Sequence, residues 1–121
     1  MKGPERDRQK RITDALELYQ WLWCHFRPAY TAKGYRTAIE GHKGFPDIVA
    51  VKYGLMLLIE VKRDKGRLSP EQEVWLQRLA EVSLNTDDGE AEAGPPVQYW
   101  FCDSDDTETA LLSLISGGRL T

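Results

Sequence analysis

Two short apolar runs separated by three residues constrain this chain more than any other feature. The runs are residues 48–51 and 55–61, with Lys52, Tyr53 and Gly54 between them. Their length and their β-branched content are typical of two strands joined as a β-hairpin. Both faces of the runs are apolar, so we expect helices to cover the sheet on both sides. The pattern therefore predicts an α/β fold with a buried hairpin at its centre.

Helical patterns flank the hairpin on both sides. Apolar residues three and four apart across residues 11–26 predict one amphipathic helix, which Pro28 would end. After the hairpin, Ser69, Pro70 and Gln72 have the residue types of an N-cap, a first turn and a capping box. The other expected elements are a short strand at residues 35–39, a strand at residues 97–102, and a last helix from about residue 107 that Gly117 and Gly118 end.

The chain has the length of one domain with one core. It contains 121 residues, of which 41% are apolar, and two domains of half that size would each bury little apolar surface. Residues 1–10 are polar, charged and without periodicity, which predicts a frayed or disordered basic arm. We therefore expect a single domain over residues 11–121, with a mobile acidic loop at about residues 85–96.

No part of the sequence is typical of a membrane or secreted protein. A membrane span needs roughly 18 consecutive apolar residues, and no apolar signal-peptide segment follows the charged N-terminus. We expect a cytoplasmic protein without a membrane partner. Cys24 and Cys102 are too far apart for a zinc motif, so both are expected to be buried free thiols. His25 and His42 are more typical of packing or surface positions than of ligands.

Charge is distributed unevenly along the chain, although its formal net value is only -3. The first 78 residues carry 15 basic and 10 acidic side chains, whereas residues 79–121 carry one basic and nine acidic ones. The first two thirds could therefore face the phosphates of a nucleic acid. Ordinary solvated surfaces explain such a surplus equally well, so charge alone does not identify a partner.

The register of the hairpin brings charged residues together. If the turn is centred between Tyr53 and Gly54, Asp47 and Glu60 face each other with Cβ atoms roughly 4.5 to 5.5 Å apart. Two like charges at that distance are destabilising unless a cation lies between them, and carboxylate pairs are ligands that Mg²⁺ or Mn²⁺ prefers. Lys62 projects from the same face as Glu60, because side chains alternate along a strand. A register shift of one residue would move Asp47 to the other face.

Each of these residues also has an ordinary explanation when taken alone. Asp47 could belong to a turn, and Glu60 could pair with Lys62 or Arg63. Together they interrupt an otherwise apolar hairpin, where ionisable groups are costly unless they have a function or a partner. We therefore expect Asp47 and Glu60 to hold a metal ion, and Lys62 to orient a water molecule or stabilise developing charge. The backbone carbonyl of Val61 is a further expected ligand.

The same residues resemble a known signature. Pro46-Asp47, twelve intervening residues and Glu60-Val61-Lys62 resemble the motif of PD-(D/E)xK nucleases. The wider segments GFPDI (44–48), LIEVK (58–62) and GRLSPEQ (66–72), followed by Trp75, resemble the VRR-NUC family of virus-type replication-repair nucleases. The resemblance covers about residues 44–79.

This resemblance implies a fold, an activity and partners. The fold is a restriction-endonuclease-like core, in which helices flank a central mixed β-sheet in the order α-β-β-β-α-β. The activity is Mg²⁺- or Mn²⁺-dependent hydrolysis of phosphodiester bonds in DNA, without an organic cofactor. For a short, phage-like member of the family, the resemblance also implies a homodimer. Its substrate would be branched DNA, such as a Holliday junction or a flap, in replication, recombination or repair.

The resemblance also implies further site residues. An acidic residue of the first helix completes the metal site in this family, which here implies Glu17, with Asp14 as the alternative. The family's glutamine matches Gln72, which would contact Lys62 or the substrate, although its capping-box position is an equally good explanation. Apart from the resemblance, Lys65 and Arg67 lie in the loop beside the expected site, where they could contact the phosphates of nucleic acid, although an ordinary solvated loop explains them as well. The same two explanations apply to Lys43 and Arg36.

Two other functions are compatible with the sequence. The chain could bind DNA or a replication partner through a nuclease-like fold without cutting, or it could be an interaction domain whose acidic C-terminal third binds a basic partner. Intact Asp47, Glu60 and Lys62 favour the enzyme. Fold resemblance by itself does not establish activity, because function depends on the site.

Overall fold

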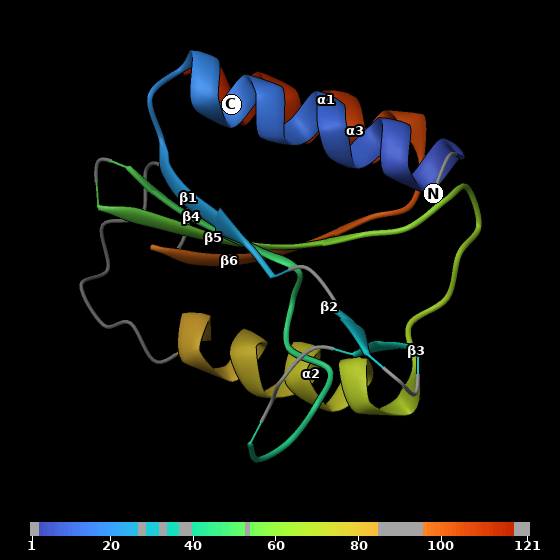
Figure 1. The fold of residues 1–121 in the computed structure, drawn as a ribbon. Helices are drawn as coiled ribbons and strands as arrows, with labels where there is room; N and C mark the ends of the chain where they lie inside the picture. The colour runs from blue at the N-terminus through green and yellow to red at the C-terminus, as the bar shows by residue number, and fades with distance from the viewer. Residues whose placement is uncertain are drawn as a thin grey trace.

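The computed structural model of the chain describes residues 3–26, 29–31, 34–36, 40–52, 54–84 and 96–117. A β-sheet forms the middle layer, with α1 and α3 on one face and α2 on the other (Figure 1). This arrangement confirms the predicted α/β fold, with a central mixed sheet between helices. In chain order, the elements are α1 (Pro4–Leu18), β1 (Leu22–His25), β2 (Ala29–Thr31), β3 (Gly34–Arg36), β4 (Ile48–Lys52), β5 (Leu55–Val61), α2 (Pro70–Leu84), β6 (Val97–Cys102) and α3 (Asp105–Ile115).

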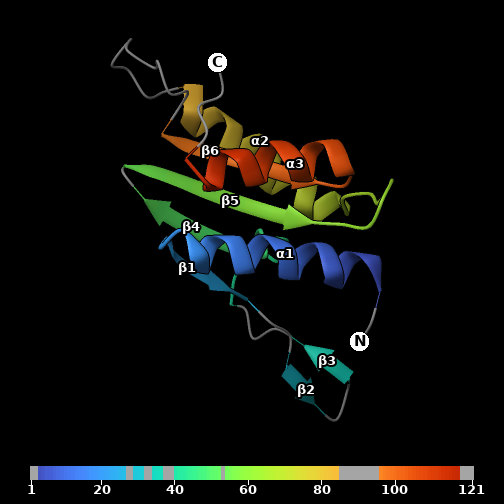
Figure 2. The same cartoon turned by 90° about the horizontal axis from the view of Figure 1, so that it is seen from above.

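The main sheet has the strand order β1-β4-β5-β6. β4 is antiparallel to both β1 and β5, whereas β6 is parallel to β5. The register of the central hairpin is the predicted one, with Ile48 opposite Ile59 and Lys52 opposite Leu55. β2 and β3 form a separate antiparallel pair to the side of the main sheet (Figure 2). β3 confirms the start of the strand predicted at residues 35–39, and residues 37–39 lie outside the described ranges.

The hydrophobic core lies between the sheet and the pair α1 and α3. Alternate residues of β4 and β5 enter this layer, and they are fully buried because both helices cover them. The opposite face of the sheet, which α2 covers, is more exposed to solvent. Leu58 is buried there, but Val49 and Val51 are only partly buried and Met56 is exposed. The core residues are Ile12, Leu16, Trp21, Ile48, Ala50, Leu57, Ile59, Val61, Cys102, Leu111 and Ile115.

The N-terminal segment is helical, so the expected disordered arm over residues 1–10 is wrong from Pro4 onward. Pro4 occupies the start of α1, and Glu5 and Asp7 lie in its first turn, where the helix dipole favours negative charge. The first turns lack apolar residues and bury Arg8 instead. Periodicity of apolar residues could not detect a helix that is held through a charged side chain.

The helix predicted over residues 11–26 is also wrong in its second half. α1 ends at Leu18, Gln20 has a left-handed φ of 64°, and the chain returns as strand β1. The turn allows Trp21 to enter the core, where its indole N–H donates to the carbonyl of Ile115 at 2.9 Å. Leu22, which the helical pattern would have buried, is 77% exposed. The prediction failed because the aromatic residues in and around the edge strand β1 happen to follow the three- and four-residue spacing of the preceding helix.

The two later helices begin with side-chain caps. Gln72 and Ser69 form the predicted capping box: Ser69 N–H donates to Gln72 Oε1 at 2.8 Å, and Gln72 N–H donates to Ser69 Oγ at 3.2 Å. α3 starts at Asp105, two residues before the predicted Thr107, because Ser104 accepts the Thr107 N–H as its N-cap. Gly117 follows α3 with a left-handed φ of 93° and confirms the predicted stop.

The remaining sequence predictions concern the acidic loop, the number of domains, membrane spans and the cysteines. The acidic loop at residues 85–95 lies outside the described ranges, and the single-domain organisation stays a prediction. Among the helices that the structure describes, none is long and apolar enough to cross a membrane. Both cysteines are free thiols; Cys102 is buried as expected, but Cys24 is exposed on the edge strand β1.

Candidate functional site

Asp47 and Glu60 lie next to each other at one end of the β4–β5 hairpin. Asp47 is the residue before β4, and its carbonyl accepts the N–H of Phe26 at 2.8 Å, which extends the pairing with β1 by one step. Ile48 faces Ile59, so the next pair in this register is Asp47 and Glu60. Their carboxyl groups interact directly. The facing arrangement expected from the sequence is therefore present.

The segment before Asp47 is fixed against the start of α2. Gly44 has a left-handed φ of 103°, and a Cβ at this position would lie 2.7 Å from the backbone of Glu71. The Trp75 indole N–H donates to the carbonyl of Lys43 at 3.0 Å. The Phe45 ring packs edge-on against Trp75, with ring centroids 5.0 Å apart. These contacts explain the glycine and the aromatic residues around the Pro-Asp motif, because they hold the backbone that carries Asp47.

The two carboxyl groups are unfavourable to ionise in this position. Burial and the charge of Asp47 raise the pKa of Glu60 to about 8. Burial likewise raises the pKa of Asp47. Glu60 is 1% exposed, and its Oε1 has no hydrogen-bond partner among the described residues. A buried carboxylate oxygen without a partner is costly, so folding alone does not explain this pair.

Lys62 is the third charged residue at this end of β5. Its Nζ lies 3.7 Å from Glu60 Oε2, close enough for an ion pair but long for a hydrogen bond. Its positive charge acts to lower the pKa of both carboxyl groups, although burial outweighs this effect. The predicted trio of Asp47, Glu60 and Lys62 therefore occupies one site.

The backbone of Val61 faces β4. Met56 N–H donates to Pro96 O and Lys62 N–H donates to Cys102 O, so the even-numbered residues of β5 pair with β6. Because backbone groups alternate along a strand, Val61 turns its carbonyl toward β4, on the side where Asp47 lies. The expected role of this carbonyl as a ligand is compatible with its direction and stays a prediction.

The carboxylate pair fits a divalent cation. Carboxylate oxygens are the donors that Mg²⁺ and Mn²⁺ prefer, and a cation would provide Glu60 Oε1 with a partner and offset the repulsion. No group of three or more His, Cys, Asp or Glu side chains within the described ranges is placed to hold a metal ion. Among the described residues, Asp47 and Glu60 are the facing carboxylates that could hold a cation.

The structure does not bring Glu17 or Asp14 to the carboxylate pair. Lys52 donates to the carbonyl of Tyr19, so the end of α1 lies beside the hairpin turn. Asp47 is five residues away along β4, which corresponds to about 17 Å at ~3.4 Å per residue. Glu17 instead accepts a hydrogen bond from the Trp23 indole at 3.0 Å. Asp14 is exposed and pairs with Lys10 one turn earlier in α1.

Glu5 is the acidic residue of α1 that lies on the side of the site. Its charge raises the pKa of both Asp47 and Glu60, and its side chain lines a hollow together with Lys62. The start of α1 lies at the same end of the molecule as the end of β5 (Figure 2). Sequence analysis missed Glu5 because it belongs to the segment that was interpreted as disordered. The helix start signal of Pro4 with acidic residues behind it could have found it.

Two other residues near the carboxylates were not predicted. His25 is paired with Ile48 in the β1–β4 register, and its charge would lower the pKa of the neighbouring Asp47. Tyr99 of β6 is opposite Leu58, so it shares the face of Glu60. Burial raises the pKa of Tyr99, with a further contribution from Glu60, and its hydroxyl has no hydrogen-bond partner among the described residues. No sequence signal marks either residue as part of a site.

A basic loop follows Lys62 and surrounds a hollow of about 440 Å³ beside the site. Lys65 and Arg67 line this hollow as expected, together with Arg63 and Lys62. Lys43 is exposed and lies 3.5 Å from Glu71 at a second hollow, so it is not part of the basic loop. Arg36 lies in β3, and its side chain is outside the part of the chain that is described.

Gln72 lies at the start of α2 and uses Oε1 in the capping box with Ser69. This hydrogen bond supports the structural explanation of its position. A contact between its amide nitrogen and Lys62 or a substrate stays a prediction.

Comparison with known proteins identifies the family. The model of the VRR-NUC domain matches residues 28–92, which is more than half of the chain and includes Asp47, Glu60 and Lys62. A search among curated proteins gave no significant match. The match agrees with the mixed sheet, the flanking helices and the charged trio described above. The chain therefore belongs to the VRR-NUC family, whose domain is a nuclease-type DNA-processing domain.

Proposed function

We propose that this domain is a divalent-metal-dependent deoxyribonuclease, with Asp47, Glu60 and Lys62 at its active centre. One observation carries the proposal: the partly buried carboxyl group of Asp47 faces the buried one of Glu60, and one oxygen of Glu60 lacks a partner among the described residues. An arrangement that is costly for folding is common at functional sites, because it serves the reaction and not stability. A bound Mg²⁺ or Mn²⁺ ion removes this cost.

Each residue has a distinct part in the proposed mechanism. Asp47 and Glu60 would hold the cation, with the carbonyl of Val61 as a further ligand. The cation supplies Lewis acidity, which activates water and offsets the negative charge of the phosphate. Lys62, beside Glu60, would either orient the attacking water or stabilise the charge that develops on the phosphate.

Glu5 replaces Glu17 as the acidic residue that α1 contributes in this proposal. It lines the hollow that also contains Lys62, and its negative charge reaches both carboxyl groups of the pair. From that position it would accept a hydrogen bond from a water molecule of the cation's shell. Its proposed part is to orient water beside the carboxylate pair.

The basic loop would bind the DNA backbone next to the reacting phosphate. Arg63, Lys65 and Arg67 surround the hollow beside Lys62 and are all exposed. Arginine and lysine side chains bind phosphate without reading base sequence. This loop therefore supports a substrate that is selected by shape, and we propose branched DNA such as a junction or a flap.

A homodimer is part of the proposal because one such centre cuts one strand. Two cuts in a branched substrate need two centres, and a two-fold dimer supplies them in a fixed relation. Sedimentation of the protein with a four-way junction tests this point. A complex with two protein chains is expected, and one that stays at a single chain at all ratios contradicts the dimer.

Cleavage of a labelled panel tests the function itself. The panel contains Holliday junction, flap, single-stranded and duplex DNA, each incubated with Mg²⁺, Mn²⁺ or EDTA. Products are expected with either metal and not with EDTA, and Asp47→Asn and Lys62→Met are expected to lower the rate by more than ~100-fold. Asp14→Asn and Lys10→Met change the same residue types in an exposed ion pair of α1 and should leave the rate unchanged. DNA binding without cleavage by folded wild-type protein would favour a non-cutting binding module.

A further inference from the structure

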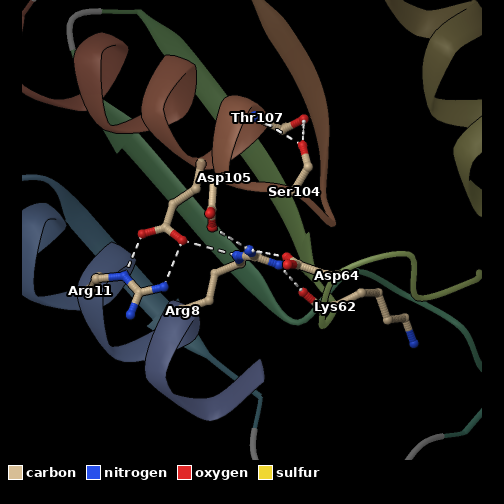
Figure 3. A network of polar contacts seen from close by, with 8 residues as sticks. Arg8, Arg11, Lys62, Asp64, Ser104, Asp105 and Thr107 are labelled. Atoms are coloured by element: carbon tan, nitrogen blue, oxygen red, sulfur yellow. Dashed lines mark hydrogen bonds and ion pairs between the residues drawn. The ribbon is translucent and has the colours of Figure 1, made fainter. Parts of the chain in front are cut away.

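Arg8 is a buried arginine that links three parts of the fold at the back of the site. Its side chain is 4% exposed and its guanidinium donates to four acceptors (Figure 3). Two acceptors belong to the segment after β5: the carbonyl of Lys62 at 2.8 Å and Asp64 Oδ1 at 2.6 Å. The other two belong to α3: Asp105 Oδ1 at 3.0 Å and Glu108 Oε1 at 2.9 Å.

We infer that Arg8 is a positioning residue for Lys62, and that it fixes the lysine backbone where β5 leaves the sheet. This inference rests on the proposed function, because it concerns the lysine of that centre. Arg8 lies outside residues 28–92, the part of the chain that matches the family. The contact therefore adds to the site a residue that the family match does not cover.

The backbone of Lys62 is held from two sides. Its N–H donates to the carbonyl of Cys102 at 2.9 Å, which is the last bond of the β5–β6 pairing. Its carbonyl lies beyond the strand and accepts from Arg8 Nη1. With both backbone groups bonded, the Cα–Cβ direction of Lys62 is set, and the side chain extends toward Glu60. Figure 3 shows the Lys62 carbonyl on the Arg8 side and the ammonium on the opposite side.

The loop after Lys62 depends on the same contacts. Asp64 receives Arg8 Nη2, and Lys65 N–H donates to Asp103 O at 3.2 Å while its φ is a left-handed 59°. The loop then returns so closely that a Cβ on Gly66 would lie 2.7 Å from the Cβ of Lys62. A tight turn of this kind transmits small shifts to Lys62, so the anchor at Asp64 also affects the lysine.

Arg8 is itself held in a fixed, charged state. Burial opposes its charge, but the hydrogen bonds to Asp64, Glu108 and Asp105 outweigh burial and raise its pKa. Glu108 is also buried, and Arg11 donates to it, which lowers the Glu108 pKa. Arg8 therefore keeps its charge in the folded protein, and its hydrogen bond to the Lys62 carbonyl is made to an acceptor that does not titrate.

Arg11 provides a matched control within the same network. Arg11 and Arg8 both lie on α1 and both bind Glu108, but among the described residues Arg11 makes no hydrogen bond or ion pair with Lys62 or Asp64. A purely structural network would make the two arginines equivalent with respect to Lys62. A positioning role predicts that only Arg8 affects the lysine.

The test compares wild type with Arg8→Met, Arg8→Lys and Arg11→Met by two measurements on the full chain. The first is hydrogen exchange of the amides at residues 62–66, which does not depend on nuclease activity. The second is single-turnover cleavage of the best substrate with Mn²⁺, analysed for rate and apparent affinity. Arg8→Lys keeps a buried cation that cannot span four acceptors, so it remains informative if Arg8→Met does not fold.

Faster exchange at residues 62–66 in the Arg8 variants, with a cleavage rate about 10- to 100-fold lower and unchanged substrate affinity, is the expected result. Arg11→Met should match wild type in both measurements. Equal behaviour of the Arg8 and Arg11 variants would overturn the inference. If wild type cuts no substrate, the proposed function fails, and the exchange measurement still decides whether Arg8 fixes the backbone of Lys62.

Discussion

At the scale of single residues, Glu60 makes the metal-free protein sensitive to pH. Its pKa is raised from 4.5 to about 8 in the folded chain by burial and by Asp47. A carboxyl group with a raised folded pKa binds its proton more tightly in the folded state, so stability is lost as pH rises through this window. In EDTA, the melting temperature of wild type should therefore fall between about pH 5 and pH 8.

Glu60→Gln removes the titrating group and keeps the side-chain shape. Its melting temperature in EDTA should depend less on pH than that of wild type, and at pH 8 it should exceed it by several degrees, about 1 kcal/mol or more. Thermal unfolding followed by circular dichroism across this pH range measures both curves. Parallel curves for the two proteins would show that the ionisation of Glu60 does not destabilise the folded protein in EDTA.

Tyr99 has a buried hydroxyl without a partner among the described residues, and burial together with the charge of Glu60 raises its pKa. Tyr99→Phe removes an unsatisfied group without leaving a large cavity, so in EDTA the free energy of unfolding should stay unchanged or rise by up to ~1 kcal/mol. Denaturant titration measures this value, with Tyr19→Phe at an exposed position as the control. A loss of more than ~1 kcal/mol would mean that the hydroxyl is hydrogen-bonded.

The sequence was sufficient to predict which residues lie at the centre of the candidate site and insufficient for those around it. Asp47, Glu60 and Lys62 could be placed together because a hairpin register fixes which residues face each other. A start signal at Pro4 could have indicated the helix that carries Glu5 and Arg8, but not where they lie relative to Lys62, because that depends on how α1 crosses the sheet. That crossing is set by tertiary contacts, such as the bond from Arg8 to the Lys62 carbonyl, which leave no periodic signal in the chain.

At the scale of elements, Gly44 is required where the loop before Asp47 meets α2. Gly44→Ala introduces a left-handed strain and a Cβ 2.7 Å from the backbone of Glu71, which cannot move without disturbing the first turn of α2. Gly41→Ala is the matched control, because Gly41 has a similar φ of 98° and no atom within 4 Å of the added Cβ. Both variants should lose stability by the φ strain, and Gly44→Ala should lose at least ~1 kcal/mol more.

Denaturant titration of the two glycine variants checks this difference. Equal losses in the free energy of unfolding would mean that the loop and α2 can move apart to accommodate the added Cβ without loss of stability. Because the loop positions Asp47, a larger loss in Gly44→Ala should be accompanied by weaker binding of Mn²⁺, while Gly41→Ala should bind it as wild type does.

Element prediction succeeded where local chemistry and tertiary structure agree. The hairpin and the capping box of α2 are specified by adjacent residues, and both are present as predicted. The helix over residues 11–26 failed because the spacing of its apolar residues fits both a helix and an aromatic-rich edge strand. The decision between them lies at Gln20, whose left-handed turn is stabilised by the burial of Trp21 under α3 and not by the local sequence.

At the scale of the whole molecule, a net charge of -3 opposes DNA binding, so any attraction must come from a local surface. The basic loop around the hollow beside Lys62 is that surface in our proposal. Arg67→Gln should weaken DNA binding and reduce the slope of log affinity against log salt by about 0.9. Lys10→Gln changes the net charge equally on the exposed side of α1 and should leave the slope unchanged. Fluorescence anisotropy over a salt series measures both slopes.

The layers of the molecule could be predicted from the two apolar faces of the hairpin, but the contact between α1 and α3 could not. α1 and α3 lie side by side over the sheet (Figure 2), connected by Arg8, Arg11 and Glu108. These residues are about 100 positions apart in the chain, and charged residues at such a separation give no pairing signal in a single sequence. The structure thus adds the Arg8 contacts, which connect α1 and α3 to the backbone of Lys62.

The claim that Asp47 and Glu60 form a divalent-cation site is tested most directly by calorimetric titration of Mn²⁺ into wild type, Asp47→Asn and Glu60→Gln at pH 8, with Asp14→Asn as the control. Binding to wild type and to Asp14→Asn, with loss of binding in both site variants, is the predicted result. Equal Mn²⁺ binding by all four proteins, or binding by none of them while all are folded, would contradict the site.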